Sequence, residues 1–489
     1  MPSKSPTPVL NDDILLEVMA VSDTVADCAR LMRTSRILYD RGPPFVLARD
    51  TPRLTKESHL LSFLAFLRRE PARRCPLVHR LELSLGDRVF KPSLLQLIDT
   101  LPLINDLQYL SIDEAESFLG FPGLNNDLVA AFATLTSLHE LRMTGASHAA
   151  IGLLHGIRSE PIRLHLNFAR GRTRGRVNST FSTDIPERNW PHFHPVLLLA
   201  RWASSLEELH TDYWYTHPRT PPLTDVVYPQ MRALTLAHTT PPLILPFIRA
   251  YPNLESFSIR TSWQASTDLW PPIAYREENA EAQQNAGLAW ARLRAFEGGL
   301  MDLFMLGLAC RVERVVLHTM DADRMHMLPA GLADVRPRRL ELRGWPGHAR
   351  VFTWGNPLPV LFQAEGVERL EELLVTTELE AKNADFDMAA ALVKLWRGLE
   401  HSPLHDLTLR ILIGSAGNDA QNQPLTMAAQ SVRDLDIEDH LKQLAVTVPT
   451  LRTAVVFVQD ARERKTREAT LTNVGFGYKE RRMPPYVSA

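Results

Sequence analysis

The sequence lacks the features that mark several large classes of protein. It has only three cysteines in 489 residues, Cys28, Cys75 and Cys310, which lie far apart. They form neither a Cys-x-x-Cys ligand pair nor the framework of a small disulfide-rich domain, which favours a reducing intracellular compartment. The first eight residues lack the apolar core of a secretory signal, and no apolar run reaches the roughly 18 residues that cross a membrane. We therefore expect a cytoplasmic or nuclear protein.

An excess charge and recognisable catalytic motifs are also missing. The formal net charge is −2, so no general attraction to nucleic acid or to an anionic membrane is expected. The sequence contains no Gly-x-Ser-x-Gly elbow, no phosphate-binding glycine-rich loop and no His-Glu-x-x-His pair. We expect a protein that is not an enzyme, with no cofactor, no bound metal, and neither nucleic acid nor membrane as a partner. A hydrolase without a known motif is the catalytic alternative.

What the sequence does contain is a recurring hydrophobic phrase, Leu-x-x-Leu-x-Leu or a close variant. Because successive side chains of a strand face opposite sides, Leu-x-Leu sends two of them into one core. Counted from the central leucine, the expected strand anchors are Leu81, Leu110, Leu141, Leu164, Leu209, Leu234, Phe257, Phe296, Val315, Leu340, Leu373, Leu407 and Ala454. The shortest interval, Phe296 to Val315, is 19 residues and the longest, Leu407 to Ala454, is 47. Leucine-rich repeats usually run about 20–29 residues, so this array is irregular.

Amphipathic segments between the anchors predict helices that cover the sheet. They lie at residues 93–101, 128–135, 242–250 and 388–399, and two long insertions occupy residues 170–195 and 262–285. The sequence therefore predicts an α/β fold in which residues 76–460 form an irregular leucine-rich-repeat solenoid with a curved, mostly parallel sheet. We expect residues 461–489 to be a C-terminal tail.

A small helical module is expected before the array. Residues 1–8 read as a disordered lead, and Asn11 or Asp12 can cap a helix whose apolar face includes Ile14, Leu15 and Val18. A second helical stretch covers residues 24–39, which gives a module of two or three short helices over residues 9–50. Residues 51–75 are expected to link this module to the array, with a strongly amphipathic helix between residues 54 and 69.

The module resembles a divergent F-box of the kind found in fungal F-box-like leucine-rich-repeat proteins. The matching segments are Asn-Asp-Asp-Ile-Leu-Leu-Glu-Val-Met at residues 11–19 and Cys-Ala-Arg-Leu-Met-Arg-Thr-Ser-Arg-Ile-Leu-Tyr at residues 28–39. Leu10-Asn11 stands where that family usually has Leu-Pro, and Ser35 where it commonly has a cysteine. The resemblance covers about 40 of 489 residues.

The resemblance implies a substrate-recognition subunit of a Skp–cullin–F-box ubiquitin ligase. Its expected partners are a Skp-type adaptor with its cullin complex and a protein substrate held by the array. The residues expected to dock the adaptor, or to form the core of the module, are Leu10, Ile14, Leu15, Val18, Leu31 and Leu38. The alternative is a leucine-rich interaction scaffold that has lost its adaptor.

The aromatic residues around the first long insertion are the expected partner-binding surface. Rigid aromatic side chains give a large contact area at low entropic cost. The residues are Trp202, Tyr213, Trp214, Tyr215 and Trp263. The competing interpretation is that they pack in the core. Nearby, the basic run Arg170–Arg176 is expected to be a solvated loop, and His192 with His194 are expected to be exposed histidines without the further ligands that a metal site requires.

Overall fold

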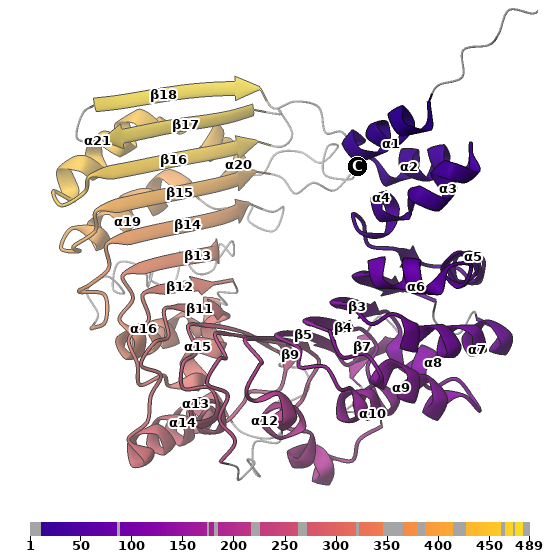
Figure 1. Cartoon of the computed structure of the whole chain (residues 1–489). Helices are drawn as coiled ribbons and strands as arrows, with labels where there is room; N and C mark the ends of the chain where they lie inside the picture. Colours follow the sequence, from indigo (N-terminus) through magenta and orange to yellow (C-terminus); the bar gives the residue numbers. More distant parts are fainter. Residues whose placement is uncertain are drawn as a thin grey trace, which may run out of the picture. The chain divides into compact units, whose positions relative to one another are not determined.

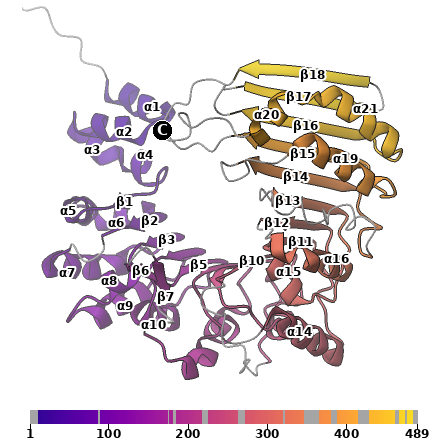
Figure 2. The ribbon, with the colours of Figure 1, turned by 180° about the vertical axis from the view of Figure 1, so that it is seen from behind.

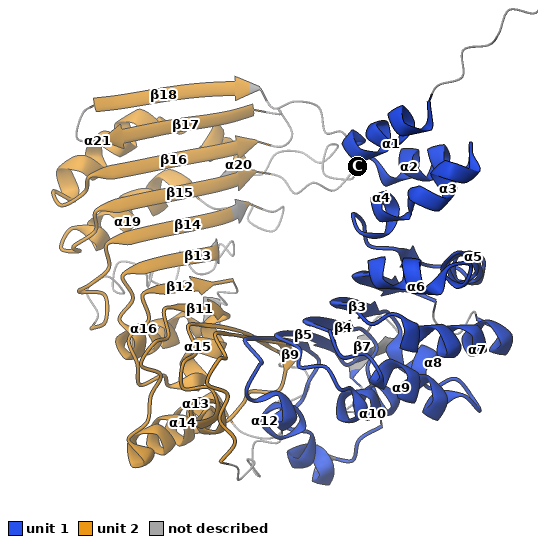
Figure 3. Ribbon diagram, viewed as in Figure 1, with its two compact units in different colours: residues 1–215 blue, residues 216–489 orange. Residues whose placement is uncertain are grey.

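The computed structural model describes residues 11–85, 89–173, 176–179, 184–216, 225–262, 271–318, 322–345, 365–379, 387–413, 427–460, 465–472 and 475–482. The chain divides into two compact units, residues 1–215 and 216–489 (Figure 3). Unit 1 holds the helical module and the first six strands of the large sheet. Unit 2 holds the remaining repeats. Both units are mixed α/β structures.

The N-terminal module consists of four short helices, α1 (Asp12–Val21), α2 (Val25–Met32), α3 (Arg36–Arg41) and α4 (Pro43–Leu47). Of the two predicted caps, Asn11 and Asp12, it is Asn11 that caps α1, since its side chain accepts a hydrogen bond from Asp13 N at 3.1 Å. The stretch that we expected to be one helix is two, because the Ser35 hydroxyl accepts from Leu38 N at 3.2 Å and so starts α3. The shared core of the module is small and consists of Met19, Cys28, Met32 and Leu38.

The predicted amphipathic linking helix is present as α5 (Glu57–Arg68), and α6 (Pro71–Arg74) follows it. The last residue of α6, Arg74, is completely buried. Its guanidinium lies over the rings of Tyr39 in α3, at 4.8 Å, and Phe66 in α5, at 4.3 Å. Its Nη1 also donates to Phe66 O at 3.0 Å. The linking helices are therefore packed against the module and do not form a free connection.

In unit 1 the strands β1 (Arg53–Leu54), β2 (Arg80–Leu83), β3 (Tyr109–Ile112), β4 (Glu140–Met143), β5 (Arg163–Asn167) and β8 (Glu208–Asp212) pair side by side in parallel. The predicted anchors of this unit form one row across neighbouring strands, Leu81, Leu110, Leu141, Leu164 and Leu209. Each anchor is at most 1% exposed. The helices α7 (Lys91–Thr100), α8 (Ala115–Leu119), α9 (Asn125–Ala133) and α10 (His148–Gly156) connect the strands and pack against one another.

The first long insertion contains secondary structure of its own. β6 (Ala169–Thr173) and β7 (Arg176–Ser179) form a separate antiparallel pair, so the basic run expected to be a loop lies largely in a hairpin. A 3-10 helix (Glu187–Phe193) and α12 (Pro195–Leu198) follow before the chain returns to the sheet at β8.

Unit 2 repeats the same plan, and its strands β13 to β16 are longer than those of unit 1 (Figures 1 and 2). Its parallel strands are β9 (Ala233–Thr239), β10 (Ser256–Thr261), β11 (Ala295–Gly298), β12 (Arg314–Leu317), β13 (Arg339–Trp345), β14 (Glu372–Leu379), β15 (Asp406–Ile413) and β16 (Thr453–Asp460). The predicted anchors again pair in one row, Leu234, Phe257, Phe296, Val315, Leu340, Leu373, Leu407 and Ala454. The helices of this unit are α13 (Leu245–Ala250), α14 (Pro272–Ala286), α15 (Leu300–Leu306), α16 (Leu328–Val335), α19 (Met388–Leu399), α20 (Met427–Arg433) and α21 (Ile437–Thr447).

Most of the segment that we expected to be a tail is a β-hairpin. β17 (Lys465–Thr472) pairs antiparallel with β16, and β18 (Gly475–Arg482) pairs antiparallel with β17. Arg467 in β17 donates from its Nη1 to the backbone oxygen of Arg433 at 3.0 Å. The hairpin satisfies the open edge of β16, which would otherwise present unpaired backbone groups.

Candidate functional site

The residues expected to dock an adaptor divide into core and surface. Leu38 is completely buried, and Leu15 and Leu31 are partly buried against the module core. Ile14 is 52% exposed and Val18 is 44% exposed. Leu10 lies outside the described residues. Only the exposed members are available to a partner, because the others already hold the four helices together.

The exposed members belong to an apolar stripe along α1, which we call the α1 stripe: Ile14, Val18 and Val21. They are spaced i, i+4 and i+7, so they share one face of the helix. Val21 is 76% exposed. Three neighbouring exposed aliphatic side chains give this module an apolar contact surface, which single scattered residues would not.

The aromatic residues expected to bind a partner are mostly buried. Trp202 is 1% exposed, Trp214 0% and Tyr215 6%. The indole of Trp202 donates to Ser159 O at 2.9 Å, and that of Trp214 donates to Phe193 O at 2.7 Å. Tyr213 is partly exposed with a left-handed φ of 57°, and Trp263 lies outside the described residues. The competing interpretation therefore holds for the three buried rings.

A polar row crosses the outward face of the sheet in unit 1, and we call it the strand-face row. Its residues pair with one another from β1 to β8 in the order Arg53, Glu82, Ser111, Arg142, His165 and His210. Each of the last five stands between two inward-facing residues of its own strand, as Arg142 does between Leu141 and Met143. The row lines a surface cavity of about 310 Å³ together with Tyr109, Asp113, Asn167 and Asp212.

Neighbouring side chains hold much of this face in place. Tyr109 lies under two guanidiniums, with Arg80 at 4.2 Å and Arg142 at 5.5 Å from its ring centre. These arginines explain why a tyrosine on the outward face is only 5% exposed. Arg53 Nε donates to Glu82 Oε2 at 2.6 Å at one end of the row. The surface is thus ordered before any partner arrives, which lowers the entropic cost of binding.

The two histidines at the other end of the row are stacked, with ring centres 5.2 Å apart and planes inclined by 27°. Partial burial lowers the pKa of His165, and the charges of Arg142 and His210 lower it further. Burial also lowers the pKa of His210; Asp212 opposes this shift and Arg142 adds to it. Both rings are therefore neutral near pH 7. The two nitrogens of each ring can then offer one hydrogen-bond donor and one acceptor.

These histidines and Arg142 were not among the binding residues predicted from the sequence. The signal was nevertheless present, because each occupies the position between the two inward residues of the repeating phrase. Aligning the phrases on their anchors places Glu82, Ser111, Arg142, His165 and His210 in one column. Rows of this kind become visible only when the strands are known to pair without a register shift.

The described residues contain no group of three or more His, Cys, Asp and Glu side chains placed to hold a metal ion. His194, one of the two neighbouring histidines, is buried, and its Nδ1 accepts from Val196 N at 3.3 Å at the start of α12. It thus acts as a helix cap. Within the part of the chain that the structure covers, no helix is both long and apolar enough to cross a membrane.

Comparisons with known proteins give little further identification. No protein-family model matches the sequence, and no curated protein is significantly similar to it. Among solved structures, the chain is similar to one from a crystal structure of a TLR13–ssRNA13 complex, at 12% identity and a TM-score of 0.29. The similarity covers 84% of this chain and 54% of that one, so this chain spans about half the length of the structure that it matches.

Proposed function

We propose that this protein is a non-catalytic interaction scaffold that holds a protein ligand on its strand-face row. The observation that carries the proposal is the row itself, in which six polar side chains on neighbouring strands share one outward face. Packing of the core does not require these residue types, since the inward rows on either side fill it. A parallel array supplies such a surface on a rigid backbone, and repeat proteins commonly bind through it.

In its finer form, the proposal is that the scaffold is the substrate-recognition subunit of a Skp–cullin–F-box ubiquitin ligase. The helical module would dock the Skp-type adaptor through the α1 stripe, and the array would bring a substrate close to the ligase. The exposure of Ile14, Val18 and Val21 supports this form, because an apolar helix face needs a covering partner. The resemblance of residues 11–39 to an F-box names the class of partner.

A pull-down of the adaptor by purified full-length protein tests the docking. The double variant Ile14→Asp, Val18→Asp places two charges on the α1 stripe while leaving the buried core of the module intact. The matched control is Val446→Asp, which changes a valine that is 85% exposed on α21 in the other unit. We expect the wild type and the control to retain the adaptor and the double variant to lose it.

Wild-type protein that retains no adaptor, or a double variant that binds as well as the control, would refute the docking. The scaffold without ligase docking would then be the function. Melting curves of both variants must match that of the wild type, so that loss of binding reports the surface.

The strand-face row is tested separately by affinity purification with mass spectrometry. Arg142→Glu reverses an exposed charge at the centre of the row, and Lys442→Glu reverses one on α21 as the control. We expect a specific protein to be recovered with the wild type and with Lys442→Glu, and lost with Arg142→Glu. If the recovered proteins are the same for all three, the row is not the binding surface.

A further inference from the structure

A second ordered row, made only of arginines, lies in unit 2 just before the strands. The first residues of β11, β12, β13 and β14 pair in register as Ala295, Arg314, Arg339 and Glu372. The residues three positions earlier are Arg292, Arg311, Arg336 and Arg369. We call these four the arginine row. Four consecutive repeats thus place an arginine at the same distance in sequence before the strand.

The residues one position before the strands behave differently, because their charges alternate. Running from β10 to β14 they are Glu255, Arg294, Glu313, Arg338 and Glu371. Arg338 and Glu371 form an ion pair with 2.6 Å between Nη2 and Oε2. This alternating row largely neutralises itself across the strands, so it leaves little charge for a ligand.

The arginine row has no such compensation. Among the described residues, Arg292, Arg311 and Arg369 form no salt bridge. Arg336 pairs with Glu365 at 3.4 Å, but both side chains are exposed, at 42% and 74%, and such pairs contribute little. Like charges at neighbouring positions repel, so the row costs free energy in the absence of an anion.

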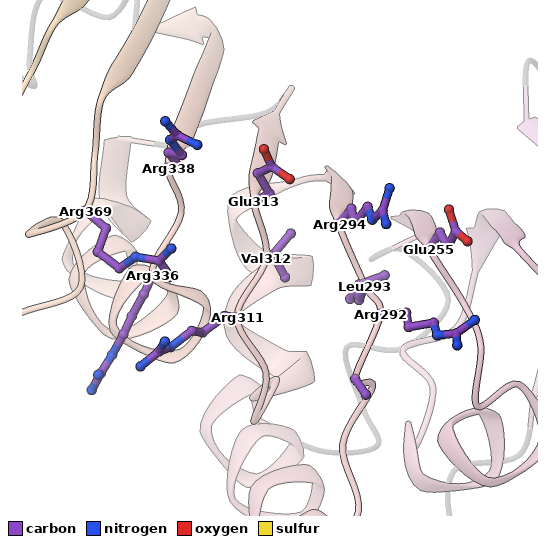
Figure 4. Close-up of a pocket in the computed structure, with 11 residues that line it drawn as sticks. Glu255, Arg292, Leu293, Arg294, Arg311, Val312, Glu313, Arg336, Arg338 and Arg369 are labelled. Carbon is purple, nitrogen blue, oxygen red and sulfur yellow. The ribbon is translucent and has the colours of Figure 1, made fainter.

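The arginine row and all members of the alternating row except Glu371 line a surface cavity of about 680 Å³ (Figure 4). Its lining carries six arginines against two glutamates, Glu255 and Glu313, which leaves an excess of four positive charges. Between the arginines, Leu293 and Val312 are buried and form an apolar base. In the close-up, Arg311, Arg336 and Arg369 lie beside one another, whereas Arg292 is directed toward the strand that carries Glu255.

We propose that this cavity binds an extended acidic segment of a partner protein, laid across the starts of β11 to β14. Neighbouring strands lie about 4.8 Å apart, so the backbone positions of the four arginines span roughly 14 Å. Alternate side chains of an extended peptide are about 6.7 Å apart, so a segment of about five residues with alternating carboxylates matches that span. Guanidiniums suit this ligand, because they bind carboxylates through two parallel hydrogen bonds.

Nucleic acid fits the cavity less well for two reasons. None of the residues that line it is aromatic, so bases would find no ring on which to stack. Glu255 and Glu313 also stand within the lining, where they oppose the close approach of a continuous phosphate backbone. An acidic peptide can place neutral residues opposite these glutamates, which a polynucleotide cannot do.

This inference deepens the proposed function by naming a class of partner segment, and it rests on the chain being a protein-binding scaffold. It does not depend on adaptor docking. The binding experiment uses the purified full-length chain alone, so its result is separate from that of the pull-down.

The test is fluorescence anisotropy with a labelled peptide of alternating glutamate and serine, and with the same peptide carrying glutamine in place of glutamate. We expect saturable binding of the glutamate peptide only, weakening as salt rises. Arg311→Ala with Arg369→Ala removes two charge-assisted contacts and should weaken binding at least tenfold. The control, Arg249→Ala with Arg410→Ala, changes two exposed arginines of the same unit outside the cavity and should bind like the wild type.

A second pair, Arg292→Gln with Arg336→Gln, removes the other half of the row and should also weaken binding at least tenfold. Melting temperatures confirm that each variant is folded. The proposal is overturned if wild-type protein does not bind the glutamate peptide, or if both row variants bind it as the control does. It is also overturned, in favour of a nucleic-acid site, if single-stranded RNA of mixed sequence displaces the peptide and binds more tightly.

Discussion

His194 should make the folding of unit 1 sensitive to mild acid. The side chain is 3% exposed, and its Nδ1 accepts a hydrogen bond from Val196 N. An accepting nitrogen must be unprotonated, and burial lowers the pKa of His194 to about 3. The folded protein therefore holds the ring neutral throughout the range from pH 7.5 to pH 5.

The size of the effect follows from the difference between the two states. In the unfolded chain a histidine has a pKa of about 6.5. As the pH falls below that value, the unfolded state takes up a proton that the folded state does not, so the free energy of unfolding decreases. The decrease approaches about 1.4 kcal/mol per pH unit below pH 6.5, and it amounts to about 2 kcal/mol between pH 7.5 and pH 5.

The measurement is denaturant unfolding of the wild type and of His194→Asn at pH 7.5 and at pH 5, with hydrogen exchange in β5 and β8 reporting unit 1. Asparagine can cap α12 but does not titrate, so it removes the proton and keeps an acceptor. We expect the wild type to lose about 2 kcal/mol more than the variant between the two pH values. If the two proteins lose the same free energy to within about 0.5 kcal/mol, His194 is not held neutral by the fold, and the reasoning fails.

Three further substitutions test the packing, each by denaturant unfolding against the wild type. Trp202→Ala should lower the free energy of unfolding by about 3–5 kcal/mol, because it removes a buried ring and leaves Ser159 O without its donor. A loss below about 1 kcal/mol would contradict the burial of Trp202. Leu141→Ala should cost about 2–5 kcal/mol, since this anchor is completely buried between β3 and β5; a near-neutral result would contradict the anchor row. Gly366→Ala should cost about 2–4 kcal/mol, because φ is +104° and the new Cβ would lie 2.5 Å from Cα of Ala333; unchanged stability would show that this turn can relax.

Much of the array could be predicted from local pattern alone. The repeating phrase located every strand anchor from Leu81 to Ala454, and the anchors pair in register within each unit. The prediction of the anchors succeeded because the alternation of inward and outward side chains along a strand can be recognised within six consecutive residues. The cap at Asn11 was predictable for the same reason, since its hydrogen bond reaches only Asp13.

Side-chain burial near the first insertion could not be predicted from local pattern. Trp202, Trp214 and Tyr215 are compatible with a binding surface or with a core, and the choice depends on what covers them. The covering groups come from distant segments, such as Phe168, whose ring centre lies 4.9 Å from that of Trp214. The hairpin of β17 and β18 is a similar case, because its strands are stable only against the open edge of β16.

The two polar rows show most directly what the sequence determined and what the tertiary structure decided. The sequence placed the strand-face residues between the inward residues of each phrase, and it placed an arginine three positions before each of four consecutive strands of unit 2. It did not show which of these positions are neighbours, since Arg292, Arg311, Arg336 and Arg369 are separated by 19, 25 and 33 residues. Only the pairing of the strands brings them side by side, because hydrogen bonds between strands align residues by register and take no account of the length of chain between them.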